Sequence, residues 1–514
     1  MTDLQTDIRS ETPKAGRREW LGLAVLALPC LLYSMDLTVL HLAVPKLTAD
    51  LRPSSVQLLW IIDIYGFFVA GSLITMGTLG DRIGRRRLLM IGAVAFGIAS
   101  VVTAFSTNAA MLIATRALLG VAGATIAPST LSLIRNMFLD PGQRTTAIGV
   151  WITSFSLGGA IGPVVGGLLL ESFRWGSVFL LAVPIMVLLL VVGPKLLPEY
   201  RDPDAGRPDL FSALLSLVAV LAMIYGLKKI AQSGFALGPV LFILAGLAVG
   251  VVFVRRQLRL PDPFLDLRLF RKLAFSASLA TYGLSILILF GGFLFLPQYL
   301  QLVLGLSPFR GGLWTLPWAL AFVVGSTATP LIVRRLRPAF VMAGGLVSGA
   351  IGFAMFMRVD ASTGFAWFAA GTTLFALGFA PVFTLTTDLV VGSAPPERAG
   401  AASAMSETSA EFGGALGIAI FGSIGVAVYR QMIGDGPAGV PPEALESAKA
   451  TLAGAIGTAR ELPGAVGAAL TTSAQEAFVR GLQLCAAISM VASLALAGFV
   501  LLTLRRSRGA APGS

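Results

Sequence analysis

Long apolar runs dominate this sequence and restrict the folds that it can adopt. A helix needs about 20 consecutive apolar residues to cross the hydrocarbon core of a bilayer, and fourteen such runs are separated by charged or Pro/Gly-rich breaks. Of the 514 residues, 56% are hydrophobic and only 12% are charged, whereas soluble domains carry about 25% charged residues. The sequence therefore predicts an all-α membrane protein with fourteen transmembrane helices. The predicted spans are 20–43, 56–79, 88–106, 109–134, 145–170, 175–196, 210–231, 237–254, 273–302, 308–332, 338–357, 365–391, 399–428 and 476–504.

The distribution of lysine and arginine predicts which side of the membrane each loop faces. An even number of spans places both termini on one side, and cytoplasmic loops are enriched in Lys and Arg. Most of the 38 Lys and Arg residues lie in the two tails and in the loops on the same side as the tails, and the run Arg85–Arg87 is one example. We therefore expect cytoplasmic N- and C-termini. The same asymmetry accounts for the net charge of +12, so no nucleic-acid partner is expected.

A weak internal repeat predicts two similar halves. "GTLGDRIGRRRLLM" follows the second span and "GSTATPLIVRRLRPAF" follows the tenth, and both run from small residues into a basic cluster. Repeated halves related by an axis along the membrane normal are typical of transporters. We expect a 6+2+6 arrangement, in which a loop at about 430–475 forms a small helical excursion near the outer surface. The predicted segments are a tail at 1–19, a six-helix half at 20–200, two inserted helices at 201–260, a second half at 261–504 and a tail at 505–514.

The most specific string in the chain is the loop that runs from Gly77 to Arg87. Its glycines allow a tight turn and a close approach of helices, and Asp81 can accept hydrogen bonds from a helix N-terminus or pair with an arginine. An ordinary basic loop on the cytoplasmic side would explain Arg85–Arg87 but not the rest of the pattern. The string resembles motif A of the major facilitator superfamily, in which this loop latches the two halves together. The resemblance assigns that role to Gly77, Asp81, Arg82, Gly84 and Arg85.

Further motifs extend the resemblance over nearly the full length. "RALLGVAGA" from Arg116 is similar to motif B of the family, with Leu119 where a Gln is usual. Residues 158–167 resemble motif C, which is typical of antiporters. "FLPQYLQLVLGLSPFRGGLWTLP" and "WIIDIYGF" resemble the fourteen-helix drug:proton antiporter branch, and within it the quaternary-ammonium and methyl-viologen efflux proteins.

The resemblance implies a proton-coupled antiporter that exports hydrophobic, mainly cationic drugs and biocides, such as quaternary ammonium compounds and dyes, by alternating access. It would be a multi-pass protein of the bacterial cytoplasmic (inner) membrane. Its expected partners are the lipid bilayer, protons and small lipophilic cations, and we expect a monomer that uses the proton gradient and needs no cofactor. An exporter of one endogenous metabolite, lipid or peptide is the alternative. A membrane-embedded enzyme is poorly supported, because the chain has a single histidine and no metal site is predicted.

The glycines of motif C also have a physical interpretation. Gly158, Gly162 and Gly166 recur every four residues, so they share one helix face and allow a second helix to pack backbone to backbone. Pro163 removes a backbone hydrogen bond and should bend the helix. Gly167 completes the string. Ordinary small-residue packing remains the alternative to a role in antiport.

Three ionisable residues are predicted to lie at a similar depth in the membrane. A rise of 1.5 Å per residue puts Asp36 roughly 24 Å from the inner end of the first helix, Asp63 roughly 10 Å from the outer end of the second, and Arg116 roughly 10–12 Å from the outer end of the fourth. Charges inside a membrane are costly and usually face a cavity or a partner. We therefore predict that the three form a proton-coupling relay, and structural hydrogen bonding is the alternative for each.

A second pair of acids is predicted near the midplane. Glu407 and Glu411 are four residues apart and so share one helix face. Two ionised carboxylates at that distance would repel each other, so we expect one to hold a proton that it can exchange for a cation. Aromatic rings could add cation–π contacts. The candidates for these contacts are Trp60, Tyr65, Trp314 and Trp318.

Overall fold

A computed structural model describes residues 13–201, 209–234, 236–260, 263, 265–306, 308–314, 316–360, 365–434 and 436–505 of the chain. Within these ranges the side chains of several residues, including His41 and Pro163, lie outside the described part.

All regular structure in the described ranges is helical, and fourteen segments are long and apolar enough to cross a membrane. The prediction of an all-α protein with fourteen spans is therefore confirmed. The longer helices are α1 (Arg17–Leu51), α2 (Ser55–Ile83), α3 (Arg85–Ala104), α4 (Ala109–Gly123), α5 (Ile126–Met137), α6 (Pro141–Ser172), α8 (Ala182–Leu196), α9 (Leu210–Ser233), α10 (Leu237–Gln257), α11 (Leu273–Phe293), α14 (Leu316–Val333), α15 (Pro338–Phe356), α16 (Phe365–Ser393), α17 (Ala399–Ile433) and α20 (Gly464–Leu504). The shorter ones are α7 (Ser177–Leu180), η1 (Leu267–Arg271), α12 (Leu296–Gln298), η2 (Tyr299–Val303), α13 (Pro308–Leu313), η3 (Pro396–Arg398), α18 (Pro442–Ala450) and α19 (Leu452–Ala459).

Four of the predicted continuous spans are interrupted. The span predicted at 109–134 divides into α4 and α5, and those predicted at 175–196, 273–302 and 308–332 divide similarly. Proline lacks the backbone N–H that would continue the hydrogen-bond ladder, but it is tolerated in the first turn of a new helix. Each helix that follows an interruption has a proline among its first three residues. These residues are Pro128 in α5, Pro184 in α8, Pro297 in α12 and Pro317 in α14.

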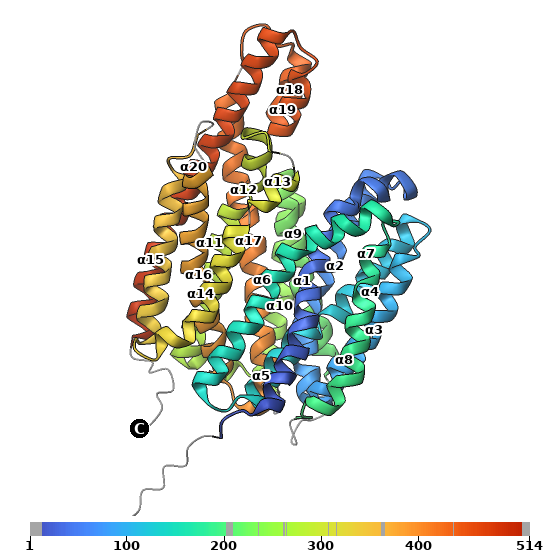
Figure 1. The fold of residues 1–514 in the computed structure, drawn as a ribbon, viewed down its shortest axis with the longest axis vertical. Coiled ribbons are helices and arrows are strands. Elements are labelled where there is room, and N and C mark those ends of the chain that lie inside the picture. Colours follow the sequence, from blue (N-terminus) through green and yellow to red (C-terminus); the bar gives the residue numbers. More distant parts are fainter. Residues whose placement is uncertain are drawn as a thin grey trace, which may run out of the picture.

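The segment predicted as an outer loop at 430–475 is a helical projection. α17 continues to Ile433, α18 and α19 follow, and α20 begins at Gly464, twelve residues before the predicted start at 476. Figure 1 shows that α18, α19 and the first turns of α20 extend away from the bundle, so this segment contains the helices that the sequence predicted and projects from the distal part of the molecule. The projection is packed, since Tyr429 donates a hydrogen bond to the carbonyl of Ala448 (2.9 Å). A rule based on membrane thickness does not limit a helix that leaves the membrane.

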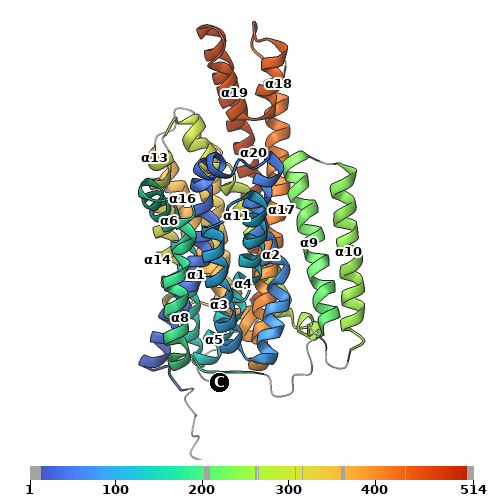
Figure 2. The ribbon, with the colours of Figure 1, turned by 90° about the vertical axis from the view of Figure 1, so that its right-hand side faces the viewer.

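The helices run roughly along one axis, and α1 begins at the same end of the bundle at which α20 ends (Figure 1). We call this the terminal end and the end with α18 and α19 the distal end. Figure 2 shows α9 and α10 side by side at the edge of the bundle. Of these two, α9 packs against both α2 and α17. The helix α6 lies along α1 and also contacts α14.

Candidate functional site

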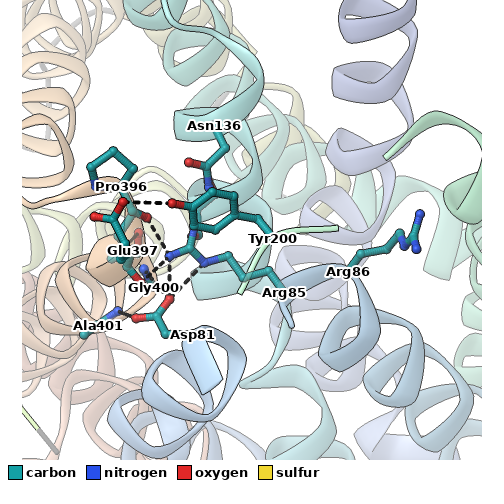
Figure 3. Close-up of polar contacts among 12 residues, drawn as sticks. Asp81, Arg85, Arg86, Asn136, Tyr200, Pro396, Glu397, Gly400 and Ala401 are labelled. Carbon is teal, nitrogen blue, oxygen red and sulfur yellow. Dashed lines mark hydrogen bonds and ion pairs between the residues drawn. The ribbon is translucent and has the colours of Figure 1, made fainter. Parts of the chain in front are cut away.

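A buried ion pair joins the end of α2 to the start of α17. Asp81 accepts hydrogen bonds from Nη2 (2.6 Å) and Nε (2.9 Å) of Arg85. It also accepts them from the backbone N–H groups of Gly400 (3.1 Å) and Ala401 (2.9 Å) in the first turn of α17. An anion at a helix N-terminus is stabilised by the unpaired N–H groups and the helix dipole. Figure 3 shows Arg85 directed at this cluster and Arg86 directed away from it.

The same arginine also binds the chain that precedes α17. Its Nη2 donates to the carbonyl oxygens of Pro396 (2.9 Å) and Glu397 (3.0 Å). The predicted motif A residues thus lie at a contact between residues far apart in sequence, at the terminal end. Arg82 lies in the last turn of α2.

Two motif A glycines are required by their surroundings. A Cβ at Gly77 would lie 2.6 Å from the carbonyl oxygen of Gly400, so α2 and α17 could not approach as they do. Gly84 has φ +108°, a backbone conformation that favours glycine, and it separates α2 from α3. Both positions therefore fix the geometry that brings Asp81 and Arg85 to α17.

The chain that follows α8 adds contacts that the sequence did not predict. The hydroxyl of Tyr200 donates to Oε1 of Glu397 (3.0 Å), and the guanidinium of Arg85 lies 5.1 Å from the centroid of the Tyr200 ring. The carboxylate of Glu199 accepts from the N–H groups of Arg86 and Arg87 (both 3.1 Å) at the start of α3. In the sequence, only the position of Glu199 and Tyr200 shortly after an apolar run could have indicated these contacts.

A second ion pair between distant helices lies near the terminal end. Nε of Arg144 and Oγ1 of Thr145, in the first turn or two of α6, each lie 2.7 Å from a carboxylate oxygen of Asp388 in α16. Arg144 and Asp388 are 244 residues apart in the sequence, and nothing in the chain marks them as partners. With the Asp81–Arg85 cluster, this contact joins segments that are far apart in the sequence at the terminal end.

Asp36 and Arg116 form an ion pair deep in the bundle. Nη1 of Arg116 lies 3.4 Å from Oδ2 of Asp36, and the two side chains are 1% and 12% exposed. The guanidinium also lies 5.3 Å from the ring centroid of Tyr65 and 5.7 Å from that of Phe179. A small cavity lined by residues of α1, α3, α7 and α8, with Asp36 among them, adjoins the pair. The structure thus brings together two of the three residues of the predicted relay.

The third residue, Asp63, lies elsewhere. Its Oδ1 accepts a hydrogen bond from Nζ of Lys228 in α9 (2.9 Å). Asp63 and Tyr65 are two residues apart, or about 200° around a helix, so Asp63 points away when Tyr65 faces Arg116. The expectation that Asp63 clusters with Asp36 and Arg116 is therefore wrong.

Glu407 and Glu411 lie in the interior on α17. The helix α17 packs against α2, α5, α9, α11 and α20, so helices from distant parts of the chain surround the helix that carries the pair. Oε1 of Glu407 is buried and has no hydrogen-bond partner among the described residues. A buried carboxylate oxygen without a partner is costly and calls for an explanation such as a proton or a bound cation.

The four candidate aromatic residues are spread over the bundle and do not form one cage. Trp60 stacks on Tyr225 of α9, with ring centroids 6.3 Å apart at 12°, while Tyr65 faces Arg116. Trp318 packs against Phe293 and Phe322. Trp314 packs as a half-buried residue at the edge of the main hydrophobic core.

The motif C glycines bring α6 against the helix that carries Asp36. A Cβ at Gly158 would overlap the carbonyl oxygen of Leu31, one at Gly162 would overlap Oγ1 of Thr38, and one at Gly166 would lie 2.9 Å from Cγ1 of Val39. These contacts span the turns of α1 on both sides of Asp36. At Gly167 a Cβ would meet nothing within 4 Å. The side chain of Pro163 is outside the described part, so the predicted bend is not assigned.

In the part of the chain that the structure describes, no group of three or more His, Cys, Asp or Glu residues is placed to hold a metal ion.

Comparisons with known proteins agree with this architecture. Residues 26–418 match the family model described as Major Facilitator Superfamily. The chain is 43% identical over 495 residues to the multidrug efflux pump LfrA of Mycolicibacterium smegmatis, covering 96% of this chain and 98% of that protein. It is 38% identical over 488 residues to the methyl viologen resistance protein SmvA of Salmonella typhimurium, covering 93% of this chain and 97% of that protein. It is 30% identical over 504 residues to the tetracenomycin C resistance and export protein of Streptomyces glaucescens, covering 96% of this chain and 94% of that protein.

Among solved structures, the human organic anion transporter MFSD10 aligns with a TM-score of 0.62 at 16% identity, covering 94% of this chain and 99% of that one. At this identity the likeness concerns the fold alone.

Proposed function

Because the chain belongs to the major facilitator superfamily, we propose that this multi-pass membrane transporter is a proton-coupled antiporter that exports hydrophobic, mainly cationic drugs and biocides. Its relatives include a multidrug efflux pump and a methyl viologen resistance protein, which supports drug efflux. Quaternary ammonium compounds and dyes are the proposed substrates. The proton gradient would be the only energy source, with no cofactor, and the protein would act as a monomer in a bacterial cytoplasmic membrane with its termini in the cytoplasm.

The observation that carries proton coupling is the ion pair of Asp36 and Arg116. An ion pair in a membrane interior is stable only while both members are charged, because each partner compensates the desolvation of the other. A proton on Asp36 would remove the attraction and release α1 from α4. The motif C glycines of α6 pack along the same turns of α1, so movement of α1 would reach α6 through backbone contacts.

The glutamates of α17 are the proposed site for substrate charge. The carboxylate oxygen of Glu407 has no partner among the described residues, and a lipophilic cation would compensate it. A proton would do the same, so cation and proton would compete for one carboxylate. Competition of this kind couples the outward movement of a cation to the inward movement of protons.

Alternating access would require the terminal end to open. The contacts of Asp81 with α17 and of Arg144 with Asp388 close that end. Substrate would enter from the terminal end when these contacts break and leave on the opposite side when they form again. The two ends would exchange roles by rocking of one half against the other.

The test is transport by the purified protein in liposomes with an imposed pH gradient. We expect ethidium movement that depends on the gradient and substrate-dependent proton movement in the opposite direction. Asp36→Asn should abolish proton-linked ethidium transport, and Asp50→Asn, the same change in an exposed part of α1, should preserve it. Wild-type protein that moves ethidium independently of the gradient would contradict antiport. Normal coupling by Asp36→Asn would contradict the role assigned to Asp36.

One relative favours the alternative of a dedicated exporter, because the Streptomyces glaucescens protein is named for tetracenomycin C alone. Inhibition of ethidium transport by a set of structurally different cations distinguishes a multidrug antiporter from a dedicated exporter. A multidrug antiporter should be inhibited by many structurally unrelated cations, whereas a dedicated exporter should respond to few or none.

A further inference from the structure

The inserted helix α9 brings a lysine to the seam between α2 and α17. α9 contacts both of these helices, which also contact each other. The three share a hydrophobic cluster that includes Phe67 and Ile74 of α2, Ile224 of α9 and Met405 of α17. Leu221 of α9 also packs where Gly71 of α2 leaves room, since a Cβ at Gly71 would lie 2.7 Å from its side chain. α9 is therefore a packed wall of the bundle at this seam.

Two matching pairs of residues connect α9 with α2. Trp60 and Asp63 are three residues apart on α2, and Tyr225 and Lys228 are three apart on α9, so each pair shares one helix face. Trp60 stacks on Tyr225, and Lys228 binds Asp63 at 2.9 Å. Nζ of Lys228 also lies 6.0 Å from the ring centroid of Phe67.

The surroundings of the Lys228 ammonium are those that bind organic cations. A carboxylate and aromatic faces form the recognition site for ammonium groups in general. The Lys228 and Asp63 side chains are 32% and 31% exposed, so the site is open to a competing ion. The site lies where α2 meets α9, and α9 also packs against α17, the helix that carries Glu407 and Glu411.

We propose that Lys228 is a tethered competitor of cationic substrates: its ammonium occupies the site formed by Asp63, Phe67, Trp60 and Tyr225, and a substrate cation binds there by displacing it. The inference rests on the proposed function and adds a residue and a site to it. It also reassigns Asp63 from the proton relay to cation binding.

The tether has a thermodynamic consequence. The bound lysine must leave before a ligand can enter. The apparent Kd of the ligand is therefore its intrinsic Kd divided by the fraction of molecules in which the site is free. If Lys228 occupies the site in about nine molecules of ten, its removal should tighten cation binding about tenfold. A lysine that only anchors α9 would have no such effect, and its loss would weaken binding or stability.

The first experiment measures binding of radiolabelled tetraphenylphosphonium, a permanent monocation, to the purified full-length protein. Lys228→Met should bind about tenfold more tightly than wild type, and Lys228→Arg should bind as wild type does. Lys229→Met makes the same change at the next position of α9 and should leave affinity unchanged. Asp63→Asn combined with Lys228→Met should lose the gain, because the carboxylate of the site is then absent.

A second measurement uses the wild-type protein and needs no variant to fold. Reductive methylation of Lys228 by formaldehyde and cyanoborohydride, followed by mass spectrometry, should increase when tetraphenylphosphonium displaces the ammonium from Asp63. Methylation of Lys228 that is unchanged or reduced by the cation would overturn the proposal. So would unchanged or weaker binding by Lys228→Met in a protein whose wild type exports cations. Wild-type protein that neither binds nor exports cations would instead contradict the proposed function.

Discussion

Nη2 of Arg85 and Oδ1 of Asp81 lie 2.6 Å apart in a pair that is almost completely buried, one turn from each other at the junction of α2 and α3. The pair has hydrogen bonds to the backbone of Pro396, Glu397, Gly400 and Ala401. Because the ion pair forms between α2 and α3 and its other hydrogen bonds reach backbone groups at and just before the start of α17, it joins these segments without using a side-chain charge of α17.

Removal of the Asp81 charge should disable this contact. Asp81→Asn keeps the size of the side chain but leaves the buried guanidinium of Arg85 without its counterion, and it weakens the anion contact with the first turn of α17. We expect transport in liposomes to fall by about tenfold or more. Arg87→Gln, on an exposed residue of the same basic run, should retain transport. Equal activity of the two variants would show that the ion pair does not control the terminal end.

The motif C glycines should differ sharply from the glycine that follows them. Gly158→Ala would place a Cβ against the backbone carbonyl of Leu31, which cannot move independently of α1, whereas Gly167→Ala adds a methyl group in open space. Overpacking of this kind costs about 1–3 kcal/mol. We expect a lower Tm and at least threefold slower transport for Gly158→Ala, with Gly167→Ala unchanged. A silent Gly158→Ala would contradict backbone contact between α1 and α6.

The distal end of α1 should respond to pH through Asp50. Hydrogen bonds from Nε1 of Trp175 (2.8 Å) and from Nη2 of Arg174 (3.0 Å) hold the pKa of Asp50 below its usual value of 3.8. A carboxyl group with a lowered folded-state pKa stabilises the fold above its unfolded pKa, and the stabilisation disappears as the pH falls through the folded value. The Tm difference between wild type and Asp50→Asn should therefore be constant above pH about 5 and shrink below pH about 4. A difference that grows on acidification would contradict this assignment.

The sequence predicted the features that depend on local composition. Hydropathy predicts the fourteen spans because each helix must be long and apolar enough to cross the hydrocarbon core by itself. The glycines and charges of motif A all lie in one short local stretch of the sequence, so the pattern itself indicates the turn. The structure places Asp81 and Arg85 of this stretch together. Depth in the membrane grouped Asp36 with Arg116, and the structure pairs these two charges.

Contacts that depend on the arrangement of distant helices could not be predicted. Asp63 has a partner in α9, and depth alone did not indicate on which face of α2 it lies. Arg144 and Asp388 are 244 residues apart, and each resembles an ordinary charge near a helix end. The early start of α20 at Gly464 also depends on a neighbour, because its Ala- and Gly-rich first part packs against α19.

The two glutamates of α17 should discriminate substrates by charge. If both carboxylates contribute to cation binding, a dication uses both and a monocation can use either. Glu407→Gln and Glu411→Gln should then each reduce methyl viologen export in everted vesicles by about tenfold, which corresponds to about 1.4 kcal/mol, and reduce tetraphenylphosphonium export by less than threefold. Glu446→Gln, on an exposed residue of α18, serves as the matched control and should change neither. An equal loss for both cations would contradict the assignment of a separate carboxylate to each positive charge of a dication.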